Sequence, residues 1–202
     1  MASGTNVGTA NLLPADILKT RGYTFVRLVS LPEHESYATS LRDSGIAVLA
    51  VVIPAQSGGY VMSNADVYQF DNERDTDQAP GDYRAAATFY QRTYPSLNWI
   101  SCGMASGQTP WWKNVQIAGG LPGFSGFAVH PYYKTPDQAR TLLKSYQSIT
   151  PQMDCWVTEW NRPAAEIPRI QKMLRENTVR SFWFCSDCGV PGFEEMPLIG
   201  RA

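Results

Sequence analysis

The sequence contains few of the residues that most metal, cofactor and nucleophile sites require. Only two histidines and four cysteines occur among its 202 residues, and there is no H-E-x-x-H pair. Cys185 and Cys188 have C-x-x-C spacing but lack the second pair of a zinc site, which leaves buried thiols, a disulfide or a redox role open. No glycine-rich fingerprint follows an early strand pattern, and no G-x-S-x-G elbow occurs. We therefore expect no metal, no cofactor and no serine nucleophile.

Charge and long apolar runs are also sparse. Charged residues make up 17% of the chain, the net charge is −1, and lysine and arginine are scattered, so the basic stripe that nucleic acid needs is missing. No apolar run approaches the roughly 20 residues of a membrane span. Met1–Gly8 has neither the basic nor the apolar region of a secretory signal. We expect a monomer without nucleic-acid or membrane partners. The cell interior, a phage particle and export by another route all stay open.

What the chain does have is a regular alternation of strand and helix patterns. Ile46–Ile53 is a continuous apolar run, typical of a parallel strand covered on both faces. Pro80 stands at the first position of the next helix, where its missing N–H costs nothing. The predicted strands are Thr24–Val29, Ile46–Ile53, Ala65–Glu73, Asn98–Gly103, Gly126–Tyr132, Asp154–Glu159 and Arg180–Cys185, with a weakly marked first strand at Thr5–Thr9. The predicted helices are Pro14–Thr20, Pro32–Ser44, one from Pro80, Trp111–Ile117, Pro136–Ser148 and Ala164–Asn177.

This alternation predicts an α/β fold with a parallel sheet and right-handed crossovers. The missing glycine-rich fingerprint disfavours an open dinucleotide-binding sheet. We therefore expect one domain over residues 1–202, a compact (β/α)8 TIM barrel. Eight repeats in 202 residues lie at the lower edge of the size range for this fold, so the βα loops must be short.

Polar residues stand at several predicted strand ends, where barrels place their active sites. Glu73 ends the fourth strand and Glu159 the seventh, which lie nearly opposite each other across an eight-strand ring. Two carboxylates placed so can approach a sugar ring from both sides, and glycosidases that retain configuration hold them about 5–5.5 Å apart. Arg27 lies inside an apolar strand, where a guanidinium is costly without a carboxylate partner.

At the end of the fourth strand, non-catalytic interpretations compete with a catalytic role for Glu73. Glu73 lies in an acidic stretch from Asp71 to Asp82, which is compatible with a solvated loop. A calcium loop fits poorly, because Thr76 takes the position that requires glycine. Gln69 and Asp71 share strand parity with Glu73, so we expect them to line the barrel mouth as well.

Other residues allow two interpretations from sequence alone. His130 by itself is more often a structural histidine, and only its place beside Tyr132 favours a site. The three aromatic residues Tyr60, Trp111 and Trp112 are compatible with a sugar cleft or with packing under a loop. His34, at a predicted helix start, is expected at the surface. No lysine lies within a predicted strand, which excludes Schiff-base chemistry there.

Taken together in strand order, these residues resemble the clan A glycoside hydrolases. Asn72-Glu73 resembles the acid/base signature of that clan, and Thr158-Glu159 its nucleophile signature. His130-Pro131-Tyr132 is similar to its sixth-strand His-x-Tyr. Arg27 resembles its second-strand arginine, and Trp183 its eighth-strand aromatic residue. The runs Val129-His130, Trp156–Glu159 and Phe182–Phe184 are similar to the small-barrel family of endo-β-1,3-glucanases.

The resemblance implies roles for these residues. Glu73 would protonate the glycosidic oxygen and Glu159 would attack the anomeric carbon. The residues that would contact the polysaccharide substrate are Arg27, Asn72, His130, Tyr132, Trp160 and Trp183. We therefore expect a retaining, endo-acting β-glycoside hydrolase that cuts a β-1,3-glucan or a related β-glycan. A phage-type lysin that cuts peptidoglycan, and a non-catalytic carbohydrate-binding barrel, remain as alternatives.

Overall fold

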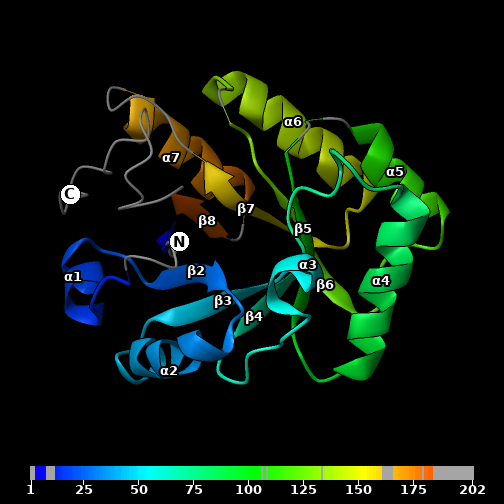
Figure 1. Ribbon diagram of the computed structural model, residues 1–202. Helices are drawn as coiled ribbons and strands as arrows, with labels where there is room; N and C mark the ends of the chain where they lie inside the picture. Colours follow the sequence, from blue (N-terminus) through cyan, green and yellow to red (C-terminus); the bar gives the residue numbers. More distant parts are fainter. Residues whose placement is uncertain are drawn as a thin grey trace.

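The computed structural model describes residues 3–7, 12–105, 107, 109–132, 134–160, 166–178 and 180–183. Eight parallel strands close into a barrel in chain order, with helices around it (Figure 1). The strands are β1 (Ser3–Asn6), β2 (Phe25–Val29), β3 (Ala47–Val52), β4 (Val67–Phe70), β5 (Trp99–Met104), β6 (Phe124–Val129), β7 (Asp154–Trp160) and β8 (Arg180–Trp183). The helices are α1 (Ala15–Thr20), α2 (Glu35–Asp43), α3 (Pro54–Ser57), α4 (Pro80–Thr93), α5 (Thr109–Ile117), α6 (Pro136–Ile149) and α7 (Ile167–Asn177).

The predicted (β/α)8 barrel is confirmed, with differences at element ends. The weak first strand exists and starts at Ser3, pairing with both β2 and β8 to close the ring. The predicted helix over Pro32–Ser44 is a 3₁₀ turn, η1 (Pro32–His34), followed by α2. The short helix α3 was not predicted. Cys185 and Cys188, with the end of the predicted eighth strand, lie outside the described residues.

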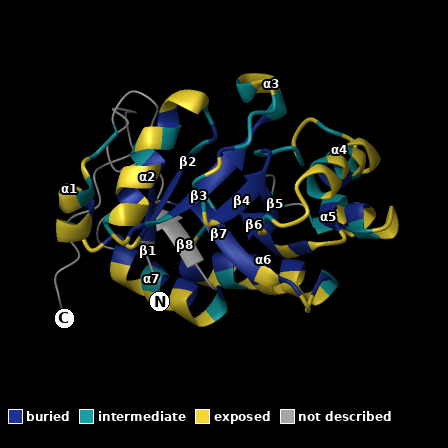
Figure 2. Ribbon diagram, turned by 90° about the horizontal axis from the view of Figure 1, so that it is seen from below, coloured by how far each residue is buried: buried dark blue, intermediate teal, exposed yellow. Residues whose placement is uncertain are grey.

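Apolar side chains form two separate layers around the strands. One cluster fills the barrel interior: Phe25 on β2 meets Trp156 on β7 edge to face, with ring centroids 6.1 Å apart. Those strands are not neighbours, so the contact must cross the interior. The larger cluster lies between the strands and the helices, whose outer faces are exposed (Figure 2). Buried polar side chains such as those of Asn6, Gln69 and Glu159 lie toward the carboxyl ends of their strands, an edge of the barrel that we call the mouth.

Three strands break regular alternation near the mouth. β4 stops at Phe70, three residues before the predicted end at Glu73, because Asp71 and Glu73 adopt left-handed backbone with φ of 64° and 53°. Register shifts interrupt the pairing of β5 with β6, and the pairing of β7 with β8 after Val157. Extra residues of this kind re-aim side chains. In β7 the irregularity lets the neighbours Thr158 and Glu159 both turn toward the mouth.

A tyrosine from α4 supports the contact between β4 and β5, whose named strands share only two paired positions. The Tyr83 hydroxyl accepts the N–H of Cys102 at 2.8 Å and donates to the carbonyl of Phe70 at 3.4 Å. Burial raises the pKa of Tyr83 well above its usual value, so the group remains a neutral phenol. The hydroxyl therefore supplies hydrogen bonds where the strands diverge.

Among the described helices, none combines the length and apolar character needed to cross a bilayer.

Candidate active site

Glu159, at the end of β7, is a buried carboxylate with both oxygens engaged. Oε1 lies 2.6 Å from Arg27 Nη1, and Oε2 accepts a hydrogen bond from the Tyr132 hydroxyl. Burial raises the pKa of Glu159, but the charges of His130 and Arg27 and the hydrogen bonds from Tyr132 and Arg27 outweigh it, so the pKa is lowered. Burial and the adjacent Glu159 raise the pKa of Tyr132, which stays a donor. Glu159 is therefore an ionised group at neutral pH.

Arg27 connects this carboxylate to two other strands. Its Nη1 also donates to Asn6 Oδ1 at 2.6 Å, its Nε to Gln69 Oε1 at 3.0 Å, and its Nη2 to Asn72 Oδ1 at 2.8 Å. Asn6 in turn donates to the carbonyl of Thr158 at 3.1 Å. The guanidinium is thus held by groups from β1, from β4 and the residues just after it, and from β7. Sequence reasoning missed Asn6, because the first strand carries almost no pattern.

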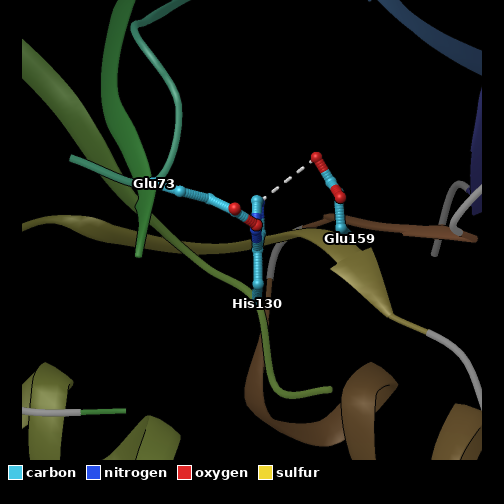
Figure 3. A group of neighbouring side chains, drawn as sticks. All are labelled: Glu73, His130 and Glu159. Carbon is cyan, nitrogen blue, oxygen red and sulfur yellow. Dashed lines mark hydrogen bonds and ion pairs between the residues drawn. The ribbon is translucent and has the colours of Figure 1, made fainter. Parts of the chain in front are cut away.

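The side chain of His130 lies between those of Glu73 and Glu159 (Figure 3). His130 Nδ1 is 3.0 Å from Glu73 Oε1, while Nε2 is 3.0 Å from Thr158 Oγ1 and 3.7 Å from Glu159 Oε1. One oxygen of each glutamate lies within 4.8 Å of the other. The Glu73 side chain is 40% exposed and that of Glu159 only 7%. The two carboxylates therefore share a site but have different environments.

The same three side chains have the donor types of a metal site, since their ligand atoms lie within 4.8 Å of one another. Both oxygens of Glu159, however, are already bound by Arg27 and Tyr132. A divalent cation at Glu159 Oε1 would stand beside a guanidinium 2.6 Å from that atom, and like charges repel strongly in a buried site. The arrangement suits proton transfer and nucleophilic attack better than metal binding.

Asn72 lies at the mouth with its carbonyl oxygen engaged. Oδ1 accepts from Arg27 and from Gln69 Nε2, the latter at 3.1 Å. This leaves the amide N–H groups of Asn72 without a protein partner among the described residues, so they can donate to a ligand. Gln69 faces the interior as expected. Asp71 does not line the mouth: it lies 2.9 Å from Arg74 Nε, because its left-handed backbone turns Asn72 inward in its place.

Trp160 and Trp183 are the two aromatic residues that were expected to contact the substrate. Trp160 is 2% exposed and packs in the cluster between strands and helices, so its side chain lies away from the mouth, where the substrate contact was expected. Alternation sends it outward after Glu159. Trp183 lies on β8, with its backbone paired to Thr5 and to Trp160, and its side chain lies outside the described part of the structure.

The remaining aromatic residues and His34 have structural partners. Trp112 is fully buried and donates to Thr150 Oγ1 at 3.1 Å, and Trp111 donates to the carbonyl of Gln78 at 2.7 Å. The Tyr60 hydroxyl donates to Glu35 at 2.7 Å. His34 was expected at the surface but is 2% exposed, with Nδ1 2.8 Å from the carbonyl of Val29. Its place on the 3₁₀ turn, directly after β2, explains this burial.

Replacing Tyr132 by phenylalanine should lower activity on the order of 10-fold, because Glu159 loses one charge-assisted hydrogen bond. The pKa of Glu159 should rise, so the acidic limb of kcat/KM should move to higher pH. Tyr37→Phe is the matched control, since the Tyr37 hydroxyl binds the carbonyl of Leu13 away from the site. Equal pH profiles for both variants would contradict the contact's proposed effect.

No family model matches the chain, and no curated protein matches it in sequence. Several solved structures match in fold. A GH128 subgroup V exo-β-1,3-glucanase from Cryptococcus neoformans superimposes with a TM-score of 0.69 at 13% identity, over 91% of this chain and 85% of the other. A GH128 subgroup IV endo-β-1,3-glucanase from Lentinula edodes gives 0.67 at 12% identity, over 91% and 82%. The endoglucanase Cel5A from Pseudomonas stutzeri gives 0.67 at 12% identity, over 99% and 90%.

These structural neighbours are glucanases, and the eight-stranded barrel of this chain is similar to them in fold. At such identities the likeness establishes the fold.

Proposed function

We propose that this chain is a retaining β-glycoside hydrolase that cuts a β-glucan. One observation supports it above the others: a carboxylate oxygen of Glu159, on β7, lies within 4.8 Å of one of Glu73, which follows β4. His130 lies between the two glutamates. Retaining enzymes hold their carboxyl groups about 5–5.5 Å apart, and inverting enzymes about 6.5–9.5 Å. The spacing favours direct attack by a carboxylate over attack by an intervening water.

The two environments divide the roles. Glu159 is buried and ionised, so it is suited to attack the anomeric carbon as the leaving oxygen departs. Glu73 is partly exposed at the mouth and would deliver the proton that the leaving oxygen takes. Water then enters, gives its proton to Glu73, and its oxygen displaces Glu159 from the anomeric carbon. Proton and leaving group therefore balance over the two steps, and configuration is retained.

The fold neighbours and the loop lengths bear on the substrate class and on the mode of cutting. The GH128 neighbours include both an exo- and an endo-β-1,3-glucanase, which favours a β-1,3-glucan without choosing the mode. Connections from strand to helix are short at several places, as between β2 and η1, where only Ser30 and Leu31 intervene. Short loops leave little material to close a pocket, so we propose internal cleavage in an open cleft.

A screen for reducing ends tests the activity and the substrate together. Wild-type protein is incubated with β-1,3-glucan, other glucans, mannan, xylan, chitin and peptidoglycan. Release from β-1,3-glucan as a ladder of oligosaccharides would support endo cleavage of that polymer. Cleavage of peptidoglycan alone would favour the lysin, and binding without cleavage of any glycan would favour a carbohydrate-binding barrel.

Replacing Glu73 by alanine should lower kcat on unactivated glucan by about 10²- to 10⁴-fold, the usual contribution of general acid–base catalysis. The loss should be much smaller for glycosylation by a dinitrophenyl glycoside, whose leaving group needs no proton. Azide should then restore turnover by attacking the glycosyl-enzyme and forming a β-glycosyl azide. Glu33→Ala, at an exposed position, is the control. Equal losses of kcat on both substrates, without rescue by azide, would show that Glu73 is not the acid.

A further inference from the structure

Gly103, on β5, leaves room for the imidazole of His130. Its φ lies outside the left-handed region, so the backbone conformation does not require glycine. A Cβ at this position would lie 2.5 Å from His130 Cε1, 2.8 Å from Cδ2 and still closer to Nε2. Real carbon contacts are about 3.5–4.0 Å. The ring therefore occupies the volume in which any other residue would carry its side chain.

The ring of His130 cannot move aside without losing a partner. Its Nδ1 faces Glu73 and its Nε2 faces Thr158, both at 3.0 Å. Its backbone N–H donates to the carbonyl of Met104 at 2.8 Å, which holds the main chain beside β5. The side chain is 0% exposed, and the Tyr132 ring packs edge-on at 5.7 Å. A methyl group at position 103 must therefore break at least one of the two ring contacts.

The main chain of Gly103 also holds Glu73. The Glu73 N–H donates to the Gly103 carbonyl at 3.0 Å, and Asn72 pairs with Gly103 as an isolated bridge. Glu73 has a φ of 53°, a conformation that costs a non-glycine residue free energy and persists only where its surroundings hold it. Gly103 thus contacts Glu73 through its own backbone and, through His130, reaches the carboxylate.

The contact between His130 and Glu73 suits both protonation states of the carboxyl group. The Thr158 hydroxyl can donate to or accept from Nε2, so either neutral form of the ring is satisfied there. Nδ1 can accept from a protonated Glu73 or donate to an ionised one. This versatility depends on the ring plane, because a rotated ring would direct Nδ1 away from Oε1.

We propose that Gly103 is a positioning residue for the acid/base: its missing side chain seats His130 against Glu73, and its carbonyl fixes the Glu73 backbone. The inference rests on the proposed function for the meaning of Glu73. Its geometric part concerns only Gly103 and His130 and can be tested without a substrate.

The first test uses the two histidines as probes in the intact, substrate-free protein. Nitrogen-15 correlation spectra of the imidazoles are recorded for wild type and Gly103→Ala, with a His34→Gln variant to distinguish the signals. His34 is the internal reference, since its ring binds the carbonyl of Val29 outside the mouth. We expect the His130 nitrogens to shift and the His34 nitrogens to stay. Unchanged His130 resonances in a folded variant would overturn the proposal.

The second test separates positioning from general loss of structure. Gly103→Ala should lower kcat on unactivated glucan about 100-fold, the effect of a misplacement near 1 Å, and should affect a dinitrophenyl glycoside far less. Gly81→Ala on α4 is the matched control, because nothing lies within 4 Å of a Cβ there. A loss of equal size on both substrates would contradict a role through the acid.

A double variant keeps the proposal testable if Gly103→Ala alone folds poorly. In a His130→Ala background the ring is gone, so Gly103→Ala should no longer lower the melting temperature. If the two substitutions lower the melting temperature additively, the steric contact between positions 103 and 130 is contradicted. If wild type cuts no glycan, the proposed function fails. The imidazole spectra and the comparison of single and double variants still test the contact between Gly103 and His130 independently of any activity.

Discussion

Replacing Glu159 by glutamine should lower kcat on every hydrolysed glycan by a factor on the order of 10⁴ or more, as loss of a covalent nucleophile does in other hydrolases. Glutamine has nearly the same shape and can still accept from Arg27, so the fold should persist. It cannot form the glycosyl-enzyme, because a neutral amide is a poor nucleophile. Rates are measured with the glycan identified by the reducing-end screen, beside Glu33→Gln at an exposed position as control.

A 2-deoxy-2-fluoro glycoside gives the same prediction a direct readout. The fluorine slows hydrolysis of the intermediate, so the sugar should remain attached and add its mass to the peptide that contains Glu159. The Glu159→Gln variant should stay unlabelled. Attachment at Glu73, or at any other residue, would show that the assigned roles are wrong.

Replacing Arg27 by methionine should destabilise the protein by about 3–5 kcal/mol at pH 7, the usual cost of removing one partner from a buried ion pair. The change leaves Glu159 buried with Tyr132 as its remaining close donor, and Asn6, Gln69 and Asn72 each lose a hydrogen bond. Unfolding in urea measures the cost. Arg42→Met is the control, because its pair with Asp66 is partly exposed at 3.5 Å and should contribute within about 1 kcal/mol.

The sign of the pH dependence distinguishes lost charge pairing from lost packing. In wild type the lowered pKa of Glu159 contributes stability that is present above the unfolded-state pKa and is lost as pH falls through the folded value. Without Arg27, burial would raise the folded pKa, so the folded variant takes up a proton as pH falls. The loss of unfolding free energy caused by Arg27→Met should therefore be largest near neutral pH and become smaller toward pH 4. A penalty independent of pH would show that packing, and not charge, is what Arg27 contributes.

Much of the barrel could be predicted because its central strands are buried on both faces. A continuous apolar run such as Ile46–Ile53 is typical of an interior strand, and proline marked the starts of α4 and α6 correctly. The first strand was weak in sequence because four residues, three of them polar and the fourth a glycine, carry little pattern. Its identity depends on pairing with β2 and β8, which are distant along the chain.

The site was less predictable wherever the backbone departs from a regular strand. Strand parity placed Asp71 at the mouth, but its left-handed conformation puts Asn72 there instead. The same reasoning could not show that the neighbours Thr158 and Glu159 both turn inward, since regular alternation allows only one of them. Gly103 carries no chemical signal at all. Its meaning appears only when the His130 ring is seen in the space beside it.

The contacts of Asn6 also bear on when the site forms during folding. This side chain on β1 reaches the carbonyl of Thr158, 152 positions away, and accepts from the guanidinium that fixes Glu159. Contacts of such long range form slowly, because the entropy of closing a large loop must be met before they stabilise anything. Glu159, the proposed nucleophile, thus reaches its final geometry only when the two halves of the chain meet. Partly folded chains with an undocked first strand would be catalytically silent, whatever else they had assembled.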